Sequence, residues 1–210
     1  MKIAVFIFDR MTSLDAVGPL EIIGRAPDAD VKIVGKTAGP VRSGKSSSGL
    51  GLIADHAIAD VPSPDILLMP GGTDMSHITS DREVLDWVRR AHETTIWTTS
   101  VCTGALVLGA AGVLDGKRAT THWSARDQLA GYGAIPVAER VVIDGKVMTG
   151  AGVSAGIDMA LTLLGKVAGD EHAQFVQLLT EYDPRPPYRS GSLETAPAAV
   201  LERVRPLMPS

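Results

Sequence analysis

The sequence contains a single cysteine, Cys102, among its 210 residues. One cysteine excludes an internal disulfide, so the fold has to be held together without such a cross-link. Positive charge is also scarce, because 20 Lys and Arg residues stand against 24 Asp and Glu residues and leave a net charge of −4. We therefore expect no nucleic-acid and no membrane partner. The five histidines form no cluster with cysteines or acids at ligand spacing, so we expect no metal site.

Long hydrophobic runs are equally rare. The apolar run Ile3–Phe8 is shorter than the roughly 7–15 residues of a signal-peptide core, and we expect a cytoplasmic protein. The longest uncharged stretch, Thr94–Leu114, carries six hydroxyl side chains and three glycines. Its first part is β-branched and its second part is rich in Ala, Leu and Gly. This pattern predicts a buried strand followed by a buried helix, not a membrane span.

The residues that are present describe a globular protein, with 45% hydrophobic and 21% charged side chains. At this length we expect one domain over residues 1–210, with a proline-rich tail from about Asp183. Strand-like and helix-like patterns alternate along the chain. The alternation predicts an α/β fold, in which a doubly wound, mainly parallel sheet is flanked by helices on both faces.

Continuous apolar runs predict strands that are covered on both faces. The predicted strands are Lys2–Phe8, Val31–Val34, Asp65–Gly72 and Thr95–Val101. Hairpins are expected at Leu50–Ile58 and at Val141–Met148, where Asp144-Gly145 is a strong turn signal. The predicted helices are Gly18–Arg25 with Pro19 in its first turn, Ser80–Glu93, Thr103–Ala111, Val153–Ala168, Glu171–Tyr182 and a short one at Ala196–Val204.

Two glycine motifs imitate nucleotide-binding sequences. Gly39–Ser46 matches the phosphate-loop pattern, but the Ser- and Gly-rich residues that follow do not favour the helix that such a loop requires. We interpret it as a polar loop. Gly150–Ala155 imitates the dinucleotide fingerprint, yet the acids Asp170 and Glu171 lie between two predicted helices instead of ending a strand. We interpret this segment as a glycine-rich turn that packs closely against another part of the chain.

Cys102 lies where a predicted buried strand passes into a predicted buried helix. A nucleophile elbow has this geometry, with the side chain pushed out at the carboxyl edge of the sheet. The amides that open the following helix favour a negative sulfur, so we expect a thiol pKa below about 8.5. Gly104 allows a close backbone approach. The alternative is that Cys102 is a small core residue.

Other candidate groups fall at the same sheet edge. Asp15 follows the first strand, and its carboxylate is suited either to proton transfer or to a turn. Gly71 and Gly72 end another strand, where their amides are able to hold a developing negative charge. His122 lies 20 residues after Cys102. It is either a base for the thiol or a histidine near Trp123 that lies on the surface or behind the reacting groups, and we favour the second interpretation.

Four segments together resemble a known superfamily. They are Leu14–Pro19, Met69–Gly72, Thr99–Gly104 and Lys117–Trp123. Their combination is similar to the ThiJ/PfpI superfamily of class I glutamine-amidotransferase-like proteins, which implies a flavodoxin-like sandwich. The resemblance extends over about residues 2–197. Further segments make it more specific and are similar to the isocyanide hydratase branch of the superfamily. These segments are Gly133–Val137, Gly156–Leu161, Glu181–Pro187 and Thr195–Pro197.

The resemblance implies a chemistry: hydration of an isocyanide to an N-substituted formamide, through a cysteine thioimidate and without any cofactor. Cys102 would be the nucleophile and Asp15 the group that moves protons. Thr103 would orient the reacting group, and the backbone at Gly72 and Val153 would stabilise the charged species. The resemblance also implies a small-molecule substrate and a homodimer.

Two departures from the common pattern bear on this resemblance. Ser100 stands where many members of the superfamily have glycine, and an aspartate accompanies the thiol where many have glutamate. The aspartate favours the hydratase branch, although it also occurs in sensor domains of AraC-type regulators. The 28 residues after Tyr182 are too few for a DNA-binding extension. The alternatives are a cysteine-based sensor or stress-response module, and a glyoxalase-type enzyme of the same superfamily.

Overall fold

A mainly parallel β-sheet forms the centre of the molecule. The computed structural model describes residues 1–44 and 49–207. Within this part, the central strands follow the order β10-β11-β7-β6-β1-β2-β5, and all neighbours are parallel except β10 and β11. The strands are β1 (Lys2–Phe6), β2 (Asp30–Gly35), β5 (His56–Ala57), β6 (Ile66–Met69), β7 (Trp97–Val101), β10 (Val141–Asp144) and β11 (Val147–Gly150).

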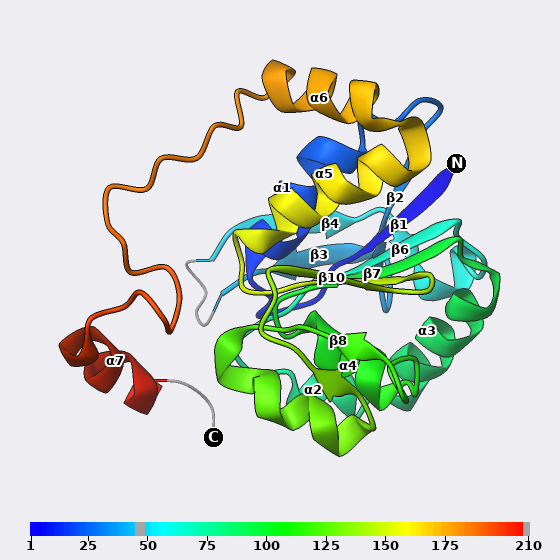
Figure 1. The fold of residues 1–210 in the computed structure, drawn as a ribbon. Coiled ribbons are helices and arrows are strands. Elements are labelled where there is room, and N and C mark those ends of the chain that lie inside the picture. Colours follow the sequence, from blue (N-terminus) through cyan, green and yellow to red (C-terminus); the bar gives the residue numbers. More distant parts are fainter. Residues whose placement is uncertain (45–48, 208–210) are drawn as a thin grey trace.

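Helices cover both faces of this sheet (Figure 1), as the sequence predicts. One face carries α1 (Ser13–Ile23), α5 (Ala155–Ala168) and α6 (Asp170–Leu179). The opposite face carries α2 (Ser76–Thr79), α3 (Arg82–Thr94) and α4 (Gly104–Ala110), and the 3-10 helix η2 (Trp123–Tyr132) packs against α4. Because both faces are covered, all four residues of β6 are buried, which explains its continuous apolar run.

Of the two predicted hairpins, one is confirmed and one has a different partner. Strands β10 and β11 pair antiparallel around Gly145, whose φ of 61° suits the turn. Residues 50–58 do not pair with one another: β4 (Gly51–Ala54) pairs with β3 (Gly39–Arg42), whereas β5 joins β2 in the central sheet. The interpretation of Gly39–Ser46 as a polar loop was therefore wrong for its first half, which forms strand β3, and Lys45 and Ser46 lie outside the described residues.

Helix α1 begins five residues earlier than predicted. The Gly18-Pro19 pair indicated a helix start, but the helix begins at Ser13 and contains Pro19 in its interior. Both residues are buried where α1 packs against α5. A Cβ on Gly18 would lie 3.2 Å from Ile157, so the two helices are close here. This packing keeps the proline in the helix, although proline costs about 3 kcal/mol in a helix interior, and it places Asp15 in the first helical turn.

The uncharged stretch Thr94–Leu114 forms β7 and α4, as predicted, and none of the described helices is long and apolar enough to cross a membrane.

Beyond α6 the chain runs as an extended tail away from the sheet (Figure 1) to α7 (Ala198–Val204), which contains no buried residue. The one-domain organisation stays a prediction. The short elements that the sequence did not indicate are η1 (Ile58–Asp60), α2, β8 (Arg118–Ala119), η2, β9 (Ile135–Pro136) and η3 (Arg205–Leu207).

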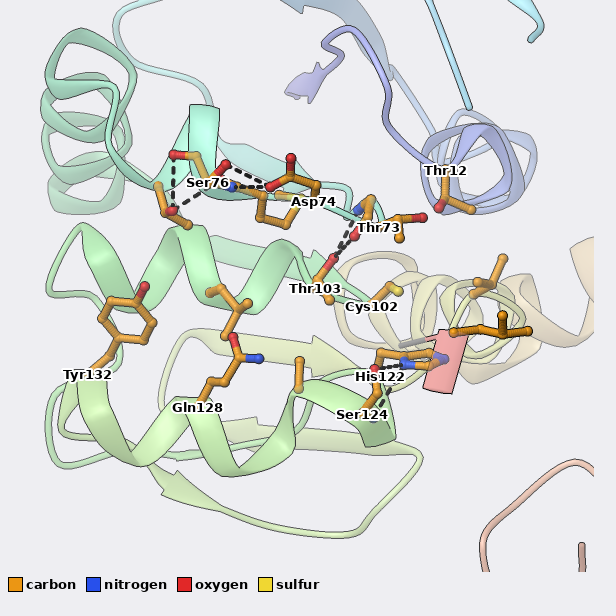
Figure 2. A pocket seen from close by; sticks show the side chains of 17 residues that line it. Thr12, Thr73, Asp74, Ser76, Cys102, Thr103, His122, Ser124, Gln128 and Tyr132 are labelled. Atoms are coloured by element: carbon orange, nitrogen blue, oxygen red, sulfur yellow. Dashed lines mark hydrogen bonds between the residues drawn. The ribbon is translucent and has the colours of Figure 1, made fainter. Parts of the chain in front are cut away.

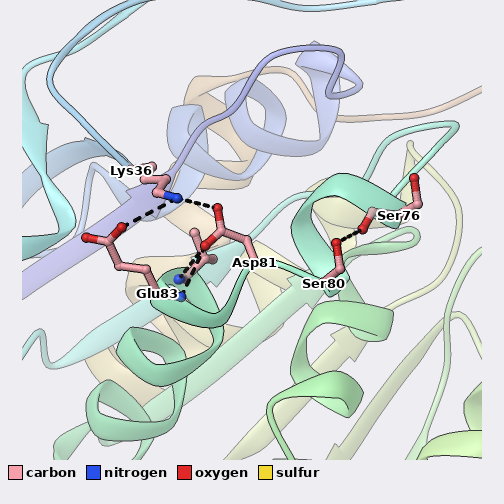
Figure 3. A network of polar contacts seen from close by, with 6 residues as sticks. Lys36, Ser76, Ser80, Asp81 and Glu83 are labelled. Carbon is pink, nitrogen blue, oxygen red and sulfur yellow. Dashed lines mark hydrogen bonds and ion pairs between the residues drawn. The ribbon is translucent and has the colours of Figure 1, made fainter.

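The start of α3 is fixed by a local polar network (Figure 3). Asp81 is the N-cap, and its carboxylate accepts hydrogen bonds from the backbone N–H groups of Glu83 at 3.1 Å and Val84 at 3.4 Å. Lys36 places its ammonium 2.6 Å from the same carboxylate and 3.4 Å from that of Glu83. The helix therefore begins two residues after the predicted Ser80, because Asp81 supplies the cap.

Removing the cap separates its contribution from that of the ion pair. We expect Asp81→Ala to lower the free energy of unfolding by about 1 kcal/mol, because the two helix N–H groups lose their acceptor. Asp81→Asn keeps a capping oxygen and loses only the charge, so it should cost less than about 0.5 kcal/mol. Urea denaturation of the two variants measures this difference, and equal losses would assign the stabilisation to Lys36.

Candidate active site

Cys102 occupies a strained turn between β7 and α4. Its φ of 56° lies in the left-handed region, which is costly for any residue with a Cβ. The backbone around it is held firmly, because its N–H lies 2.7 Å from the Ala151 carbonyl and its own carbonyl accepts a 2.7 Å hydrogen bond from the Thr121 hydroxyl. The structure places Cys102 at the strand–helix turn that the sequence predicts, and its role as a nucleophile stays a prediction.

Glycine is required beside the elbow. A Cβ on Gly104 would lie 2.2 Å from the Met69 carbonyl oxygen, and a Cβ on Gly71 would lie 2.5 Å from the Thr103 nitrogen. Both contacts are with backbone atoms and are far shorter than van der Waals separation. The ends of β6 and β7 therefore approach closely only because these residues lack side chains, as expected for Gly104.

Asp15 projects from the first turn of α1 to the same sheet edge and is fully buried. Its Oδ2 accepts a hydrogen bond of 3.1 Å from the Gly71 N–H. Its Oδ1 has no partner of good geometry among the described residues. The Cys102 thiol lies beside this carboxyl group and acts on its pKa as a hydrogen-bond donor. The acid and the thiol thus form one buried pair.

Burial changes the proton affinity of both members of the pair. Loss of hydration raises the pKa of Asp15 from 3.8 to about 7, although the Gly71 N–H and the Cys102 thiol oppose this rise. Burial and then the negative charge of Asp15 raise the pKa of Cys102 from 9.0 to about 12. The expectation of a thiol pKa below about 8.5 was wrong. The Thr103 N–H and hydroxyl do favour a thiolate, but they are outweighed by burial and by Asp15.

The resting pair therefore holds its proton on sulfur near neutral pH, and Asp15 is the group that titrates. A carboxyl group with a pKa of about 7 is suited to accept a proton and to return it. This arrangement replaces a preformed thiolate with a thiol and an adjacent base. Transfer of the thiol proton to the carboxylate would generate a thiolate nucleophile.

Thr103 connects the elbow to the Gly71-Gly72 turn. Its hydroxyl donates to the Gly72 carbonyl at 2.6 Å and accepts from the Gly72 N–H at 2.9 Å. These are two of the contacts drawn in Figure 2. Both Thr103 and Gly72 line the same cavity as Cys102, so the structure brings together the residues that the sequence singled out. The Gly72 N–H is occupied by the threonine hydroxyl in this state.

The glycine-rich turn after β11 packs closely against the site, as predicted. A Cβ on Gly152 would lie 3.1 Å from the His122 ring, and one on Gly156 would lie 3.0 Å from Pro19 and 3.1 Å from Val101. Val153, between these glycines, lines the cavity with Cys102. The turn therefore brings α5 against α1, which carries Asp15, and against the end of β7, which Cys102 follows.

His122 lines the cavity without contacting the thiol through a hydrogen bond. Its Nδ1 accepts from the Ser124 N–H at 3.4 Å and lies 2.8 Å from the Ser124 hydroxyl, so it caps η2. Because Nδ1 is an acceptor, the neutral ring carries its proton on Nε2. Burial lowers the pKa of His122, which favours this neutral form. Among the described residues, Asp15 and Thr103 shift the pKa of Cys102, and His122 does not. This supports the interpretation that His122 is not the base for the thiol.

A cavity of about 620 Å³ extends from Cys102 along α4 (Figure 2). One wall is formed by residues 72–76 and Thr79, and the other by η2, including Gln128 and Tyr132. No sequence signal indicated the η2 wall, because no helical period marks residues 123–132. It also gave none for the contact between Gly71 and Asp15, which joins segments 56 residues apart.

Metal ions in proteins are held by sets of His, Cys, Asp or Glu ligands. Among residues 1–44 and 49–207, no group of three or more His, Cys, Asp or Glu side chains is placed to hold an ion. The polar contacts of the described site are instead those of a thiol, a carboxyl group and a threonine hydroxyl. Groups of these kinds are suited to proton transfer and nucleophilic attack.

The fold and the site define a class: α/β proteins with a nucleophilic cysteine at a strand–helix elbow and an acidic neighbour. The chain belongs to the DJ-1/PfpI family, whose model matches residues 1–166. A ThiJ/PfpI family protein from Pseudomonas syringae has a crystal structure that matches with a TM-score of 0.94 and 41% identity, over 98% of this chain and 85% of that one.

Curated relatives extend this assignment. The isonitrile hydratase of Pseudomonas putida is 45% identical over 205 residues, which are 98% of this chain and 89% of that protein. The HTH-type transcriptional regulator CdhR of Pseudomonas aeruginosa is 30% identical over 79% of this chain, which spans 49% of the regulator. Drosophila melanogaster DJ-1beta, at 22% identity and a TM-score of 0.76, shares the fold.

The raised pKa of Asp15 makes a prediction about stability. A carboxyl group whose pKa is 3.8 in the unfolded chain and about 7 in the folded protein binds its proton more tightly when folded. Its ionisation therefore destabilises the protein progressively between these pH values and fully above pH 7. Asparagine stays neutral, so we expect Asp15→Asn to raise the free energy of unfolding by roughly 2 to 4 kcal/mol at pH 8 and by far less at pH 4.

Denaturant unfolding at both pH values measures this effect. Asp127→Asn is a matched control at an exposed position and should change stability by less than about 0.5 kcal/mol at either pH. An Asp15→Asn variant that gained equally at pH 4 and pH 8, or lost stability at pH 8, would show that ionisation of this carboxyl group is not costly.

Proposed function

We propose that this protein hydrates isocyanides, adding water to R–N≡C to give the N-substituted formamide without a metal or an organic cofactor. The observation that carries the proposal is the buried Asp15–Cys102 pair at the end of a cavity that accepts a small molecule. The isonitrile hydratase of Pseudomonas putida, which is similar over nearly the whole chain, supports the same activity.

The first step forms a carbon–sulfur bond. Asp15 takes the proton of the Cys102 thiol as the sulfur attacks the terminal carbon of the isocyanide. The same proton is then delivered to that carbon, which gives the thioimidate Cys102–S–CH=N–R. A soft sulfur nucleophile suits a soft carbon electrophile, and a base of pKa about 7 is suited to both transfers.

The second step consumes water and releases the enzyme. Asp15, again a carboxylate, accepts a proton from water as the water oxygen attacks the thioimidate carbon, and it passes this proton to the imine nitrogen, which becomes N–H. The tetrahedral adduct Cys102–S–CH(OH)–NH–R then collapses. Asp15 takes the hydroxyl proton as the C=O bond forms and the carbon–sulfur bond breaks, it delivers that proton to the leaving sulfur, and R–NH–CHO is released. Each proton removed is returned, so Asp15 acts as base and then as acid.

Three neighbouring groups have supporting roles in this proposal. The Thr103 hydroxyl, which exchanges hydrogen bonds with Gly72, orients the reacting group beside the sulfur. The backbone at Gly72 and at Val153, both of which line the cavity, stabilises charge that develops during attack. Binding of substrate has to displace the Gly72 N–H from Thr103 before it serves this role.

A redox-sensing role fits the geometry less well. Cysteines that are oxidised readily have a low pKa and are exposed to solvent. Cys102 is 5% exposed, and burial together with Asp15 raises its pKa to about 12. A thiol in this state reacts when a substrate brings its electrophilic carbon into the cavity. Formation of a Cys102 sulfinate in peroxide without any turnover would favour the sensor.

Assembly and location stay predictions. The family resemblance implies a homodimer, and we expect one in the cytoplasm. Helix α6 carries three exposed apolar side chains, Phe175, Leu178 and Leu179, which is the kind of surface that a second copy covers.

Replacement of the reacting groups tests the mechanism. We expect Cys102→Ala to abolish formamide production, because it removes the sulfur that bonds to the substrate carbon. We expect Asp15→Asn to lower kcat at least about 100-fold, because it removes the group that transfers the protons. Formamide release from an alkyl isocyanide is followed by chromatography. Intact-mass spectrometry should show an adduct of one substrate mass on the wild type and none on Cys102→Ala. Turnover that survives Cys102→Ala would exclude the thioimidate.

The pH dependence should report Asp15. Because the active form carries an ionised Asp15 and a protonated Cys102, kcat/KM should rise tenfold per pH unit up to about pH 7 and then stay level to pH 9. His122→Asn keeps a capping side chain on η2 and lacks a titrating ring. The acidic limb should stay near pH 7 in this variant. Its disappearance there would assign the limb to His122.

A further inference from the structure

The cavity is far larger than the reacting group requires. Its volume of about 620 Å³ falls in the range of sites for drug-sized ligands. The isocyanide carbon and nitrogen occupy only the part next to Cys102. Most of the cavity is therefore space for the R group, and its shape and lining contain information about the substrate.

The cavity is elongated and follows α4 from Cys102 toward Tyr132. Thr103 and Leu106 lie one helical turn apart on α4 and both line the cavity. Tyr132 lines it farther along, where a Cβ on Gly109 would lie 2.8 Å from the tyrosine Cβ. Thr103 to Gly109 is six helical residues, or about 9 Å. Figure 2 shows Cys102 and Tyr132 at opposite ends of this groove, with Gln128 reaching from η2 toward α4 between them.

The charges of the side chains that line the cavity disfavour an anionic R group. None of the described residues that line the cavity is Lys or Arg. Asp74 is its acidic residue. Hydrogen bonds from Ser76 hold the pKa of this carboxyl group below its ordinary value, and the guanidinium of Arg10, which is not part of the lining, lies 3.5 Å from it. A carboxylate on the R group would lose hydration in the cavity and would find no cation in the described lining. Apolar surface from Leu106, Met75 and Ala125 is present along the groove.

We propose that the groove between α4 and η2 is the subsite for the R group, and that the preferred substrates are isocyanides with an elongated, uncharged, mainly apolar R group. This inference rests on the proposed hydratase function. Leu106 contacts the middle of the R group, and Gln128 and Tyr132 contact its distal end. Binding of the longer chain removes more apolar surface from water, which favours long substrates over short ones.

A series of three isocyanides tests the subsite: n-butyl isocyanide, n-octyl isocyanide and 8-isocyanooctanoate. We expect kcat/KM of the wild type to be at least about tenfold higher for the n-octyl than for the n-butyl substrate. The carboxylate, of similar length, should be at least about tenfold poorer than n-octyl isocyanide, because its charge loses hydration without gaining a partner.

A bulky residue in the groove tests the location. Gln128 is exposed, so Gln128→Trp fills the groove from the surface and does not disturb the core. It should lower the n-octyl to n-butyl ratio of kcat/KM about tenfold. Asp127→Trp, at the adjacent exposed position outside the lining, is the matched control and should leave the ratio within about twofold. Thermal unfolding of both variants confirms that they fold.

The outcomes distinguish this inference from the function on which it rests. Turnover of all three substrates at similar kcat/KM, or an unchanged ratio in Gln128→Trp, overturns the subsite and leaves the hydratase function intact. Failure of the wild type to produce formamide from any of the three overturns the hydratase function and the subsite with it. A preference for 8-isocyanooctanoate would overturn the assignment of an uncharged R group.

Discussion

The contact between the Asp15 carboxyl group and the Cys102 thiol is the interaction on which the site depends. Both groups are acids in a buried place, where each resists ionisation because water is excluded. One negative charge is tolerated there, supported by the Gly71 N–H, and a second is not. Near neutral pH the pair therefore carries at most one negative charge, on Asp15, and the same exclusion of water makes ionisation of the pair costly to the fold.

The rest of the molecule holds these two groups together. Packing of α1 on α5 brings Asp15 to the sheet edge, and the close approach of Gly71 and Gly104 brings the ends of β6 and β7 to the same point. The left-handed backbone of Cys102 persists because both of its peptide groups are hydrogen-bonded to neighbouring segments. Strain at the nucleophile and burial of the acid are thus compensated by contacts elsewhere.

The fold by itself does not select the reaction. Drosophila melanogaster DJ-1beta shares the architecture at 22% identity, and a transcriptional regulator contains a similar segment. The proposed reaction depends on two local features of this chain, the buried aspartate on α1 and the groove bounded by η2. In the proposal the aspartate moves the protons, and the groove determines which molecules reach Cys102.

The local sequence determined the main elements and singled out the candidate reacting residues. Apolar runs identified β1, β6 and β7, and the position of Cys102 between a strand and a helix identified the elbow, because these signals are carried by neighbouring residues. The tertiary structure decided the start of α1, the partner of β4 and the pKa of the thiol. Each of these depends on packing between distant segments: Pro19 is retained in a helix by contact with α5, and the proton stays on Cys102 because Asp15, far away in sequence, is buried beside it.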